Sequence, residues 1–180
     1  MRIEPSAAAV EAGNTVTVQV LVADVTDLMG CEVHLAYDPT YVDVVDANPD
    51  EQGVQVQLGP FLSPDFVVQN GIDPATGRID VAFAVMAADS AVSGNGVVAT
   101  ITFQGKTAGT SPLTFVSVIL ADTDGHIIAV STQDGQVAVG GSVGRVAADP
   151  SPAAGILAGL GALTIVVGLV FLVLRARRPR

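Results

Sequence analysis

Residues 30–46, which read GCEVHLAYDPTYVDVVD, constrain the fold of this chain more than any other segment. Apolar and polar side chains alternate over residues 30–37, an Asp-Pro pair marks a turn, and apolar residues return over 42–46. A period of two is typical of a β-strand that turns one face to a core and the other away from it. The segment therefore predicts two strands joined by a tight turn.

The alternation also divides the first of these strands into two sets of side chains. We expect one set to face the core: Cys31, Val33, Leu35 and Tyr37. We expect the other set to face outward: Gly30, Glu32, His34 and Ala36. Because the chain has one cysteine, an intramolecular disulfide is excluded, and the apolar phase of Cys31 predicts a buried, unreactive thiol.

Short alternating segments continue along the chain, separated by clusters of Gly, Pro, Asn and Asp. Strands are expected at residues 15–23, 78–86, 96–104 and 113–121, in a final hairpin at 127–131 and 135–139, and more weakly at 54–58 and 66–69. Helical periodicity does not occur in the sequence before residue 150. This pattern predicts an all-β domain with about nine strands, arranged as a β-sandwich.

The C-terminal part of the sequence has a different character. A domain at residues 1–139 precedes a Gly/Pro/Ala-rich linker at 140–153, an uncharged apolar run at 154–174 and a basic tail at 175–180. At about 1.5 Å per residue a helix over 154–174 spans roughly the 30 Å core of a bilayer. The sequence therefore predicts a single-pass cell-membrane protein with a transmembrane helix. The arginines of the tail place the tail in the cytoplasm and the domain outside. A sorting tail that is cut and replaced by a covalent anchor is the alternative.

Charge is distributed unevenly along the chain. The full chain has a net charge of −10, but the tail holds four of its eight basic residues. The four basic residues that remain before the apolar run stand against all 18 acidic ones, a net charge of −14. A domain this acidic repels phosphate backbones, which excludes nucleic acid as a partner.

Five segments, in their order along the chain, resemble the cohesin family, the receptor modules of bacterial cellulosomes. They are VEAGNTVTVQVLVA at 10–23, the segment 30–46, GRIDVAF at 77–83, GVVATITFQGKTAG at 96–109 and the hairpin at 122–139. The resemblance implies a nine-stranded jelly-roll β-sandwich, here followed by a membrane anchor. It also implies that one flat sheet face binds a dockerin, a small two-helix module. The calcium belongs to the dockerin, so this chain itself is expected to hold no metal and no cofactor.

Strand phase and the resemblance together suggest the binding residues. In cohesins an Asn and an Asp that bond the dockerin commonly occupy the outward positions that here appear as Gly30 and Glu32. His34 shares their face, although a lone histidine is more often an ordinary surface residue. The neighbouring strand is expected to add Asp80, Ala82, Ala84 and Met86. Small residues beside a methionine form a flat, partly apolar platform on which a helix can lie, while an ordinary solvated face is the simpler interpretation.

Other functions receive less support from the sequence. Direct polysaccharide binding by the same sandwich needs exposed rings, whereas the chain has no Trp and two Tyr, one of them the inward Tyr37. No nucleophile–base pair or metal-ligand cluster is visible, so an enzyme is not expected. Residues 122–125 (DTDG) predict a turn rather than a calcium loop, because the remaining oxygen ligands are missing. A structural surface protein remains a further alternative.

Overall fold

The computed structural model describes residues 1–140, which form strands and a single 3-10 turn, η1 (Ala88–Ser90). The strands are β1 (Arg2–Glu4), β2 (Ala7–Val10), β3 (Thr15–Ala36), β4 (Val42–Val44), β5 (Gln57–Leu58), β6 (Phe66–Asp73), β7 (Arg78–Ala84), β8 (Val92–Gly105), β9 (Gly109–Asp122), β10 (Ile127–Ile128) and β11 (Gly135–Val139). The prediction of an all-β sandwich is confirmed, with eleven assigned strands rather than about nine.

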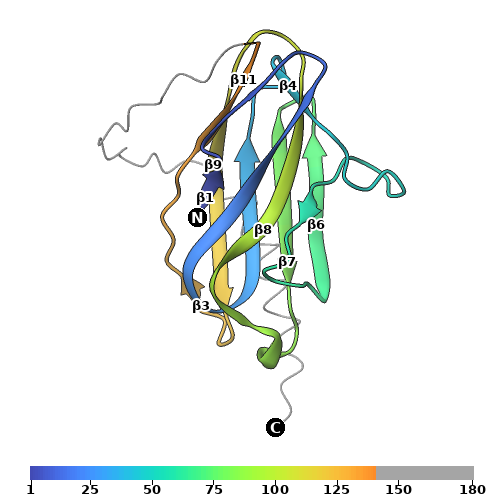
Figure 1. Ribbon diagram of the computed structural model, residues 1–180. Helices are drawn as coiled ribbons and strands as arrows, with labels where there is room; N and C mark the ends of the chain where they lie inside the picture. Colours follow the sequence, from blue (N-terminus) through green and yellow to red (C-terminus); the bar gives the residue numbers. More distant parts are fainter. Residues whose placement is uncertain (141–180) are drawn as a thin grey trace. The chain divides into compact units, whose positions relative to one another are not determined.

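Strand β3 connects the two layers of the sandwich (Figure 1). Its first part pairs with β1 and β8, and its last part pairs with β7 and β9. The sequence analysis predicted two separate strands here, at residues 15–23 and 30–37. The structure joins them, because hydrogen bonding to β8 continues, with irregular register, as far as Leu28.

The joined strand bends at two aspartates. Asp24 and Asp27 have backbone φ angles of 54° and 50°, in a region that aspartate tolerates better than most residues. Their N–H groups donate to side chains of the neighbouring strand, Asp24 to Asn95 Oδ1 at 2.7 Å and Asp27 to Ser93 Oγ at 2.9 Å. These bonds satisfy the amides at the points where the regular ladder is interrupted.

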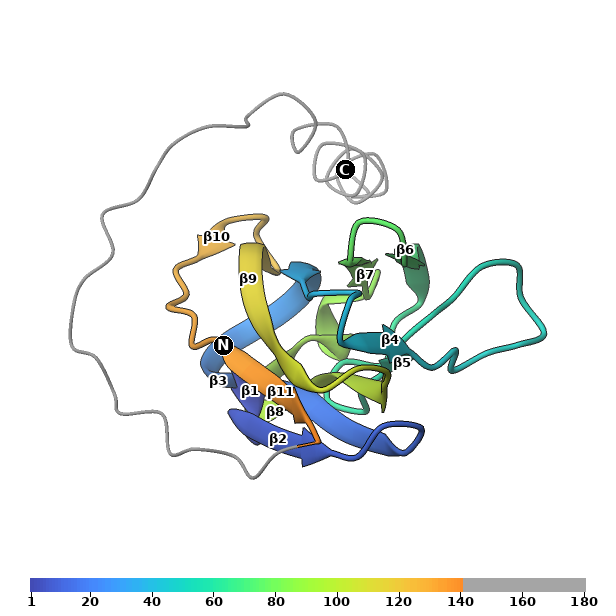
Figure 2. The same cartoon turned by 90° about the horizontal axis from the view of Figure 1, so that it is seen from above.

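The second layer carries the candidate site. Its strands lie in the order β6–β7–β3–β9, all antiparallel, and β10 and β11 pair with different parts of β9. In the view from above, β10 and β6 lie on opposite sides of this layer (Figure 2). Strand β2 extends the layer beyond β11 through parallel pairing.

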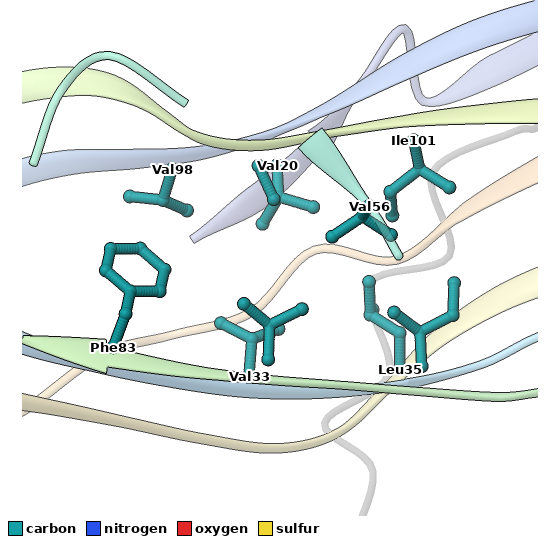
Figure 3. Close-up of a pocket in the computed structure, with 10 residues that line it drawn as sticks. Val20, Val33, Leu35, Val56, Phe83, Val98 and Ile101 are labelled. Atoms are coloured by element: carbon teal, nitrogen blue, oxygen red, sulfur yellow. The ribbon is translucent and has the colours of Figure 1, made fainter. Parts of the chain in front are cut away.

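An apolar core fills the space between the layers (Figure 3). Val20, Val98 and Ile101 come from one layer and face Val33 and Phe83 of the other. The inward set predicted for residues 30–37 is confirmed: the exposed fractions of Cys31, Val33, Leu35 and Tyr37 are 3%, 5%, 3% and 5%. Alternation therefore reported correctly which side chains of the strand face the apolar core.

The Asp-Pro turn is also confirmed, and it is held by bonds from distant strands. Tyr37 N–H donates to the Gly77 carbonyl at 2.8 Å, and Asp38 N–H donates to Ser111 Oγ at 2.8 Å. The Tyr37 ring packs edge-on against Phe103, with ring centroids 5.6 Å apart. Burial, followed by the charges of Asp43 and Asp73, raises the pKa of the Tyr37 hydroxyl to about 12.

The predicted transmembrane helix at 154–174, the basic tail and all of the linker beyond residue 140 lie outside the described residues. Within residues 1–140, no helix has the length and apolar character needed to cross a membrane.

Candidate functional site

The register of β3 and β7 brings most of the predicted site residues together. Gly30 lies opposite Ala84, Glu32 opposite Ala82, and His34 opposite Asp80. Residues directly opposite each other in an antiparallel pair share a face of the sheet. Because the intervening residues point into the core, all six lie on the other side of the layer, which we call the outer face.

Strand β9 completes the outer face. Ala121, Ile119 and Ser117 lie opposite Gly30, Glu32 and His34. These three residues were missed in the sequence because residues 113–121 are apolar on both phases. Only the pairing with β3 shows which of them belong to the outer face.

The outer face is more enclosed than the open platform that the sequence predicted. Glu32 is 6% exposed, His34 7%, Ala82 3% and Ala84 2%, while Gly30, Asp80 and Met86 are half-buried. The alanines are short: Ala82 lies in register between the longer Glu32 and Gln69, and Ala84 between Gly30 and Phe66. The charged side chains bond to one another instead of extending into water.

His34 is the centre of a charged cluster rather than a lone surface histidine. Its Nε2 lies 2.8 Å from Glu32 Oε1, and its Nδ1 bonds Asp80 Oδ1. A neutral imidazole has one N–H, so only the doubly protonated ring can donate to both carboxylates. Arg78 Nε donates to the same Asp80 oxygen at 2.9 Å. The two carboxylates of the outer face are therefore compensated within the module.

The spacing of Glu32 and His34 by two residues could have suggested part of this cluster, since it puts both on one face of a strand. Asp80 was expected on this face, but its bond to His34 could not have been predicted, because Asp80 is far away in the sequence and meets His34 through the β3–β7 register. The exposed residues Phe66 and Ile127 were missed for the same reason. They are 46% and 69% exposed, on strands that pair with β7 and β9.

Met86 lies outside the paired residues of β3 and β7. The alternation predicted a strand over residues 78–86, but β7 ends at Ala84. The N–H of Val85 donates to the Met29 carbonyl at 2.9 Å, and the N–H of Met86 donates to Asp65 Oδ2 at 2.9 Å. The bond to Met29 continues the β3–β7 register by one residue, whereas the Met86 N–H bonds the Asp65 side chain instead of the backbone of β3.

Chemistry other than binding finds little support in residues 1–140. This part of the chain holds no group of three or more His, Cys, Asp or Glu side chains that could hold a metal ion. The Cys31 thiol is buried, and desolvation, followed by the nearby Glu32 charge, raises its pKa to about 12, which makes the thiol unreactive. Among the exposed large apolar residues of residues 1–140, Phe66 is the one aromatic ring, so these residues offer no set of rings for stacking on a sugar.

The segment 122–125 forms the predicted turn. Asp122 Oδ1 accepts hydrogen bonds from the N–H groups of Asp124 at 2.9 Å and His126 at 2.8 Å. The bond from the His126 N–H is the largest cause that lowers the pKa of the Asp122 carboxyl. The Asp122 carboxylate thus stabilises the local turn by accepting these two hydrogen bonds.

Comparison with known proteins agrees with this architecture. The cohesin domain model matches residues 2–139. A type II cohesin from the cellulosome of Acetivibrio cellulolyticus is 21% identical, with a TM-score of 0.65, over 76% of this chain and 92% of that one. A non-cellulosomal cohesin from the archaeon Archaeoglobus fulgidus is 20% identical, with a TM-score of 0.60, over 74% and 86%.

A cohesin from a type I cohesin–dockerin complex of Clostridium thermocellum is 18% identical, with a TM-score of 0.61, over 74% of this chain and 94% of that one. No curated protein matches the chain. The structural likeness concerns the fold, and the family model covers nearly the whole described module. Residues 30–46 and the four segments that accompany them are thus parts of one known domain, and the chain belongs to the cohesin domain family.

Proposed function

We propose that this non-catalytic module binds dockerin-bearing proteins, such as polysaccharide-degrading enzymes or adhesins, through its outer face. The observation that carries the proposal is the strand register, which gathers Gly30, Glu32, His34, Asp80, Ala82 and Ala84 into adjacent rows on one sheet face. Family membership supports the class of partner, since the similar cohesin of Clostridium thermocellum was solved in a complex with a dockerin. In the complex proposed here, we expect the calcium to be bound by the dockerin and not by this chain.

Titration calorimetry of the full chain in detergent against calcium-loaded dockerin modules tests the proposal. We expect 1:1 binding that is lost when calcium is chelated. Ser117→Arg puts a long side chain on the outer face opposite His34, and we expect it to weaken binding at least ten-fold. Gln19→Arg adds the same charge at an exposed position on the other layer, and we expect binding to be unchanged. Equal effects of the two variants, or no binding by the wild type, would contradict the proposed site or the proposed function.

We also propose that the chain is a single-pass membrane protein, anchored by residues 154–174 with the module outside the cell and the tail in the cytoplasm. The support is the uncharged run of these residues and the four arginines that follow it. The full chain is expected to stay in the membrane pellet after alkaline extraction, and a chain that ends at residue 153 is expected to be released. Extraction of both chains would contradict the anchor, and a shortened mature mass would indicate the sorting-tail alternative.

A further inference from the structure

An apolar row crosses the outer face from one side to the other. In the pairing register Ile127 lies opposite Ala121, Ala121 opposite Gly30, Gly30 opposite Ala84, and Ala84 opposite Phe66. We call these five residues the apolar row. Its two end residues, Phe66 and Ile127, are large and exposed. The three between them are glycine or alanine: Gly30 is half-buried, and Ala84 and Ala121 are buried between their neighbours, at 2% and 7% exposure.

The dimensions of the row match one helix. Neighbouring strands lie about 4.8 Å apart, so Phe66 and Ile127, four strands apart, are separated by about 19 Å. A helix with its side chains is about 10–12 Å wide. One helix therefore fits along the strands, over the small residues and between the two exposed side chains, whose strands β6 and β10 lie on opposite sides of the layer (Figure 2).

The charged side chains beside the apolar row, Glu32, His34 and Asp80, are poorly available to a basic partner. Both nitrogens of His34 are directed at Glu32 and Asp80, and Arg78 holds the same oxygen of Asp80. The side chains of Glu32 and Asp80 are only 7% and 19% exposed. A lysine or arginine of a partner would have to displace His34 from an enclosed cluster to reach either carboxylate, and burial makes that exchange costly.

Building on the proposed function, we propose that the outer face selects a dockerin through an apolar ridge on its contact helix, without a charge pair to Glu32 or Asp80. Where the helix crosses the apolar row, its ridge presents small or aliphatic side chains at i, i+3 and i+4, one turn of the helix, which pack on the row. The cohesin resemblance assigns the Glu32 carboxylate to dockerin binding, but here this carboxylate is bonded to His34.

Substitution of Gly30 tests directly whether a partner packs on the apolar row. A Cβ built on Gly30 meets only the Ala121 Cβ, at 3.6 Å, which is an ordinary contact. Alanine is therefore accommodated, whereas a leucine side chain would extend from the sheet and occupy the position proposed for the partner helix. Glu32→Gln is the complementary variant, because glutamine keeps an acceptor oxygen for His34 and loses the charge.

The test measures dissociation constants for one bound dockerin. We expect Gly30→Leu to weaken binding about 100-fold and Phe66→Ala and Ile127→Ala about ten-fold each, while Gly30→Ala and Glu32→Gln change it less than three-fold. Thermal unfolding of each variant verifies that it is folded. If Glu32→Gln weakens binding more than ten-fold while Phe66→Ala and Ile127→Ala do not, the dockerin is selected by charge and the inference is wrong, although the proposed function stands.

A second measurement separates the inference from the proposed function. Two helical peptides with the same polar face, one with a leucine ridge and one with a lysine ridge, are added to the isotope-labelled full chain in detergent. We expect the leucine peptide alone to shift the NMR signals of Phe66 and Ile127. If it does so while no dockerin binds, the apolar row is a site for an apolar helix, and the proposal of a dockerin as its partner is wrong. If the leucine peptide does not shift these signals, the apolar row does not bind an apolar helix and the inference is wrong.

Discussion

Replacing Gly77 by alanine is expected to lower the free energy of unfolding by about 4 kcal/mol, because two costs combine at this position. Gly77 has a φ of +69°, where a Cβ adds about 1–2 kcal/mol of strain. The new Cβ would also lie 2.1 Å from the Tyr37 carbonyl oxygen, so the backbone must move. That movement strains the bond from Tyr37 N–H to the Gly77 carbonyl, which joins the Asp-Pro turn to β7.

Urea denaturation followed by circular dichroism measures the effect, and Gly13→Ala is the matched control. Gly13 has a similar φ of +85°, but a Cβ there meets nothing within 4 Å. The control should therefore lose only the backbone term, about 1–2 kcal/mol. If both variants lose the same amount, the close approach of Gly77 to Tyr37 contributes nothing to stability.

Replacing His34 by alanine is expected to cost about 3 kcal/mol of unfolding free energy. The substitution leaves the carboxylates of Glu32 and Asp80 in an enclosed site, without the ring that bonds both. Removing one partner of a buried charged pair costs about 3–5 kcal/mol. We take the low end because Arg78 still bonds Asp80, whose side chain is 19% exposed.

His126→Ala is the control for this variant, measured by the same denaturation. Its side chain is 77% exposed and lies 3.4 Å from Asp122, so the loss should stay within about 0.5 kcal/mol. Adding Glu32→Gln to His34→Ala removes one of the two uncompensated charges and should restore part of the stability. A His34→Ala loss as small as that of His126→Ala would show that the cluster does not stabilise the module.

The sequence predicted local features of the module well. Alternation identified the buried set from Cys31 to Tyr37, and the Asp-Pro pair identified the turn, because both signals lie within a few neighbouring residues. The continuity of β3 was not predicted. It depends on Asn95 and Ser93, whose side chains bond the bent backbone at Asp24 and Asp27 from another strand.

The candidate site was predicted only in part. The phase of β3 put Gly30, Glu32 and His34 on one face, and the register with β7 added Asp80, Ala82 and Ala84 as expected neighbours. The exposure of the face was not predicted, since it depends on which side chains bond one another. The strand was predicted to reach Met86, whereas β7 ends at Ala84 and the Met86 N–H bonds the Asp65 side chain.

By itself the sequence determined that residues 1–139 form an all-β module with a given set of inward side chains, because strand periodicity is a local property. Tertiary structure alone decided that His34 bonds both Glu32 and Asp80, and that Phe66 and Ile127 lie at the two ends of one apolar row. Those arrangements depend on the register of strands far apart in the chain. A shift by one residue would turn every side chain of a strand to the other face.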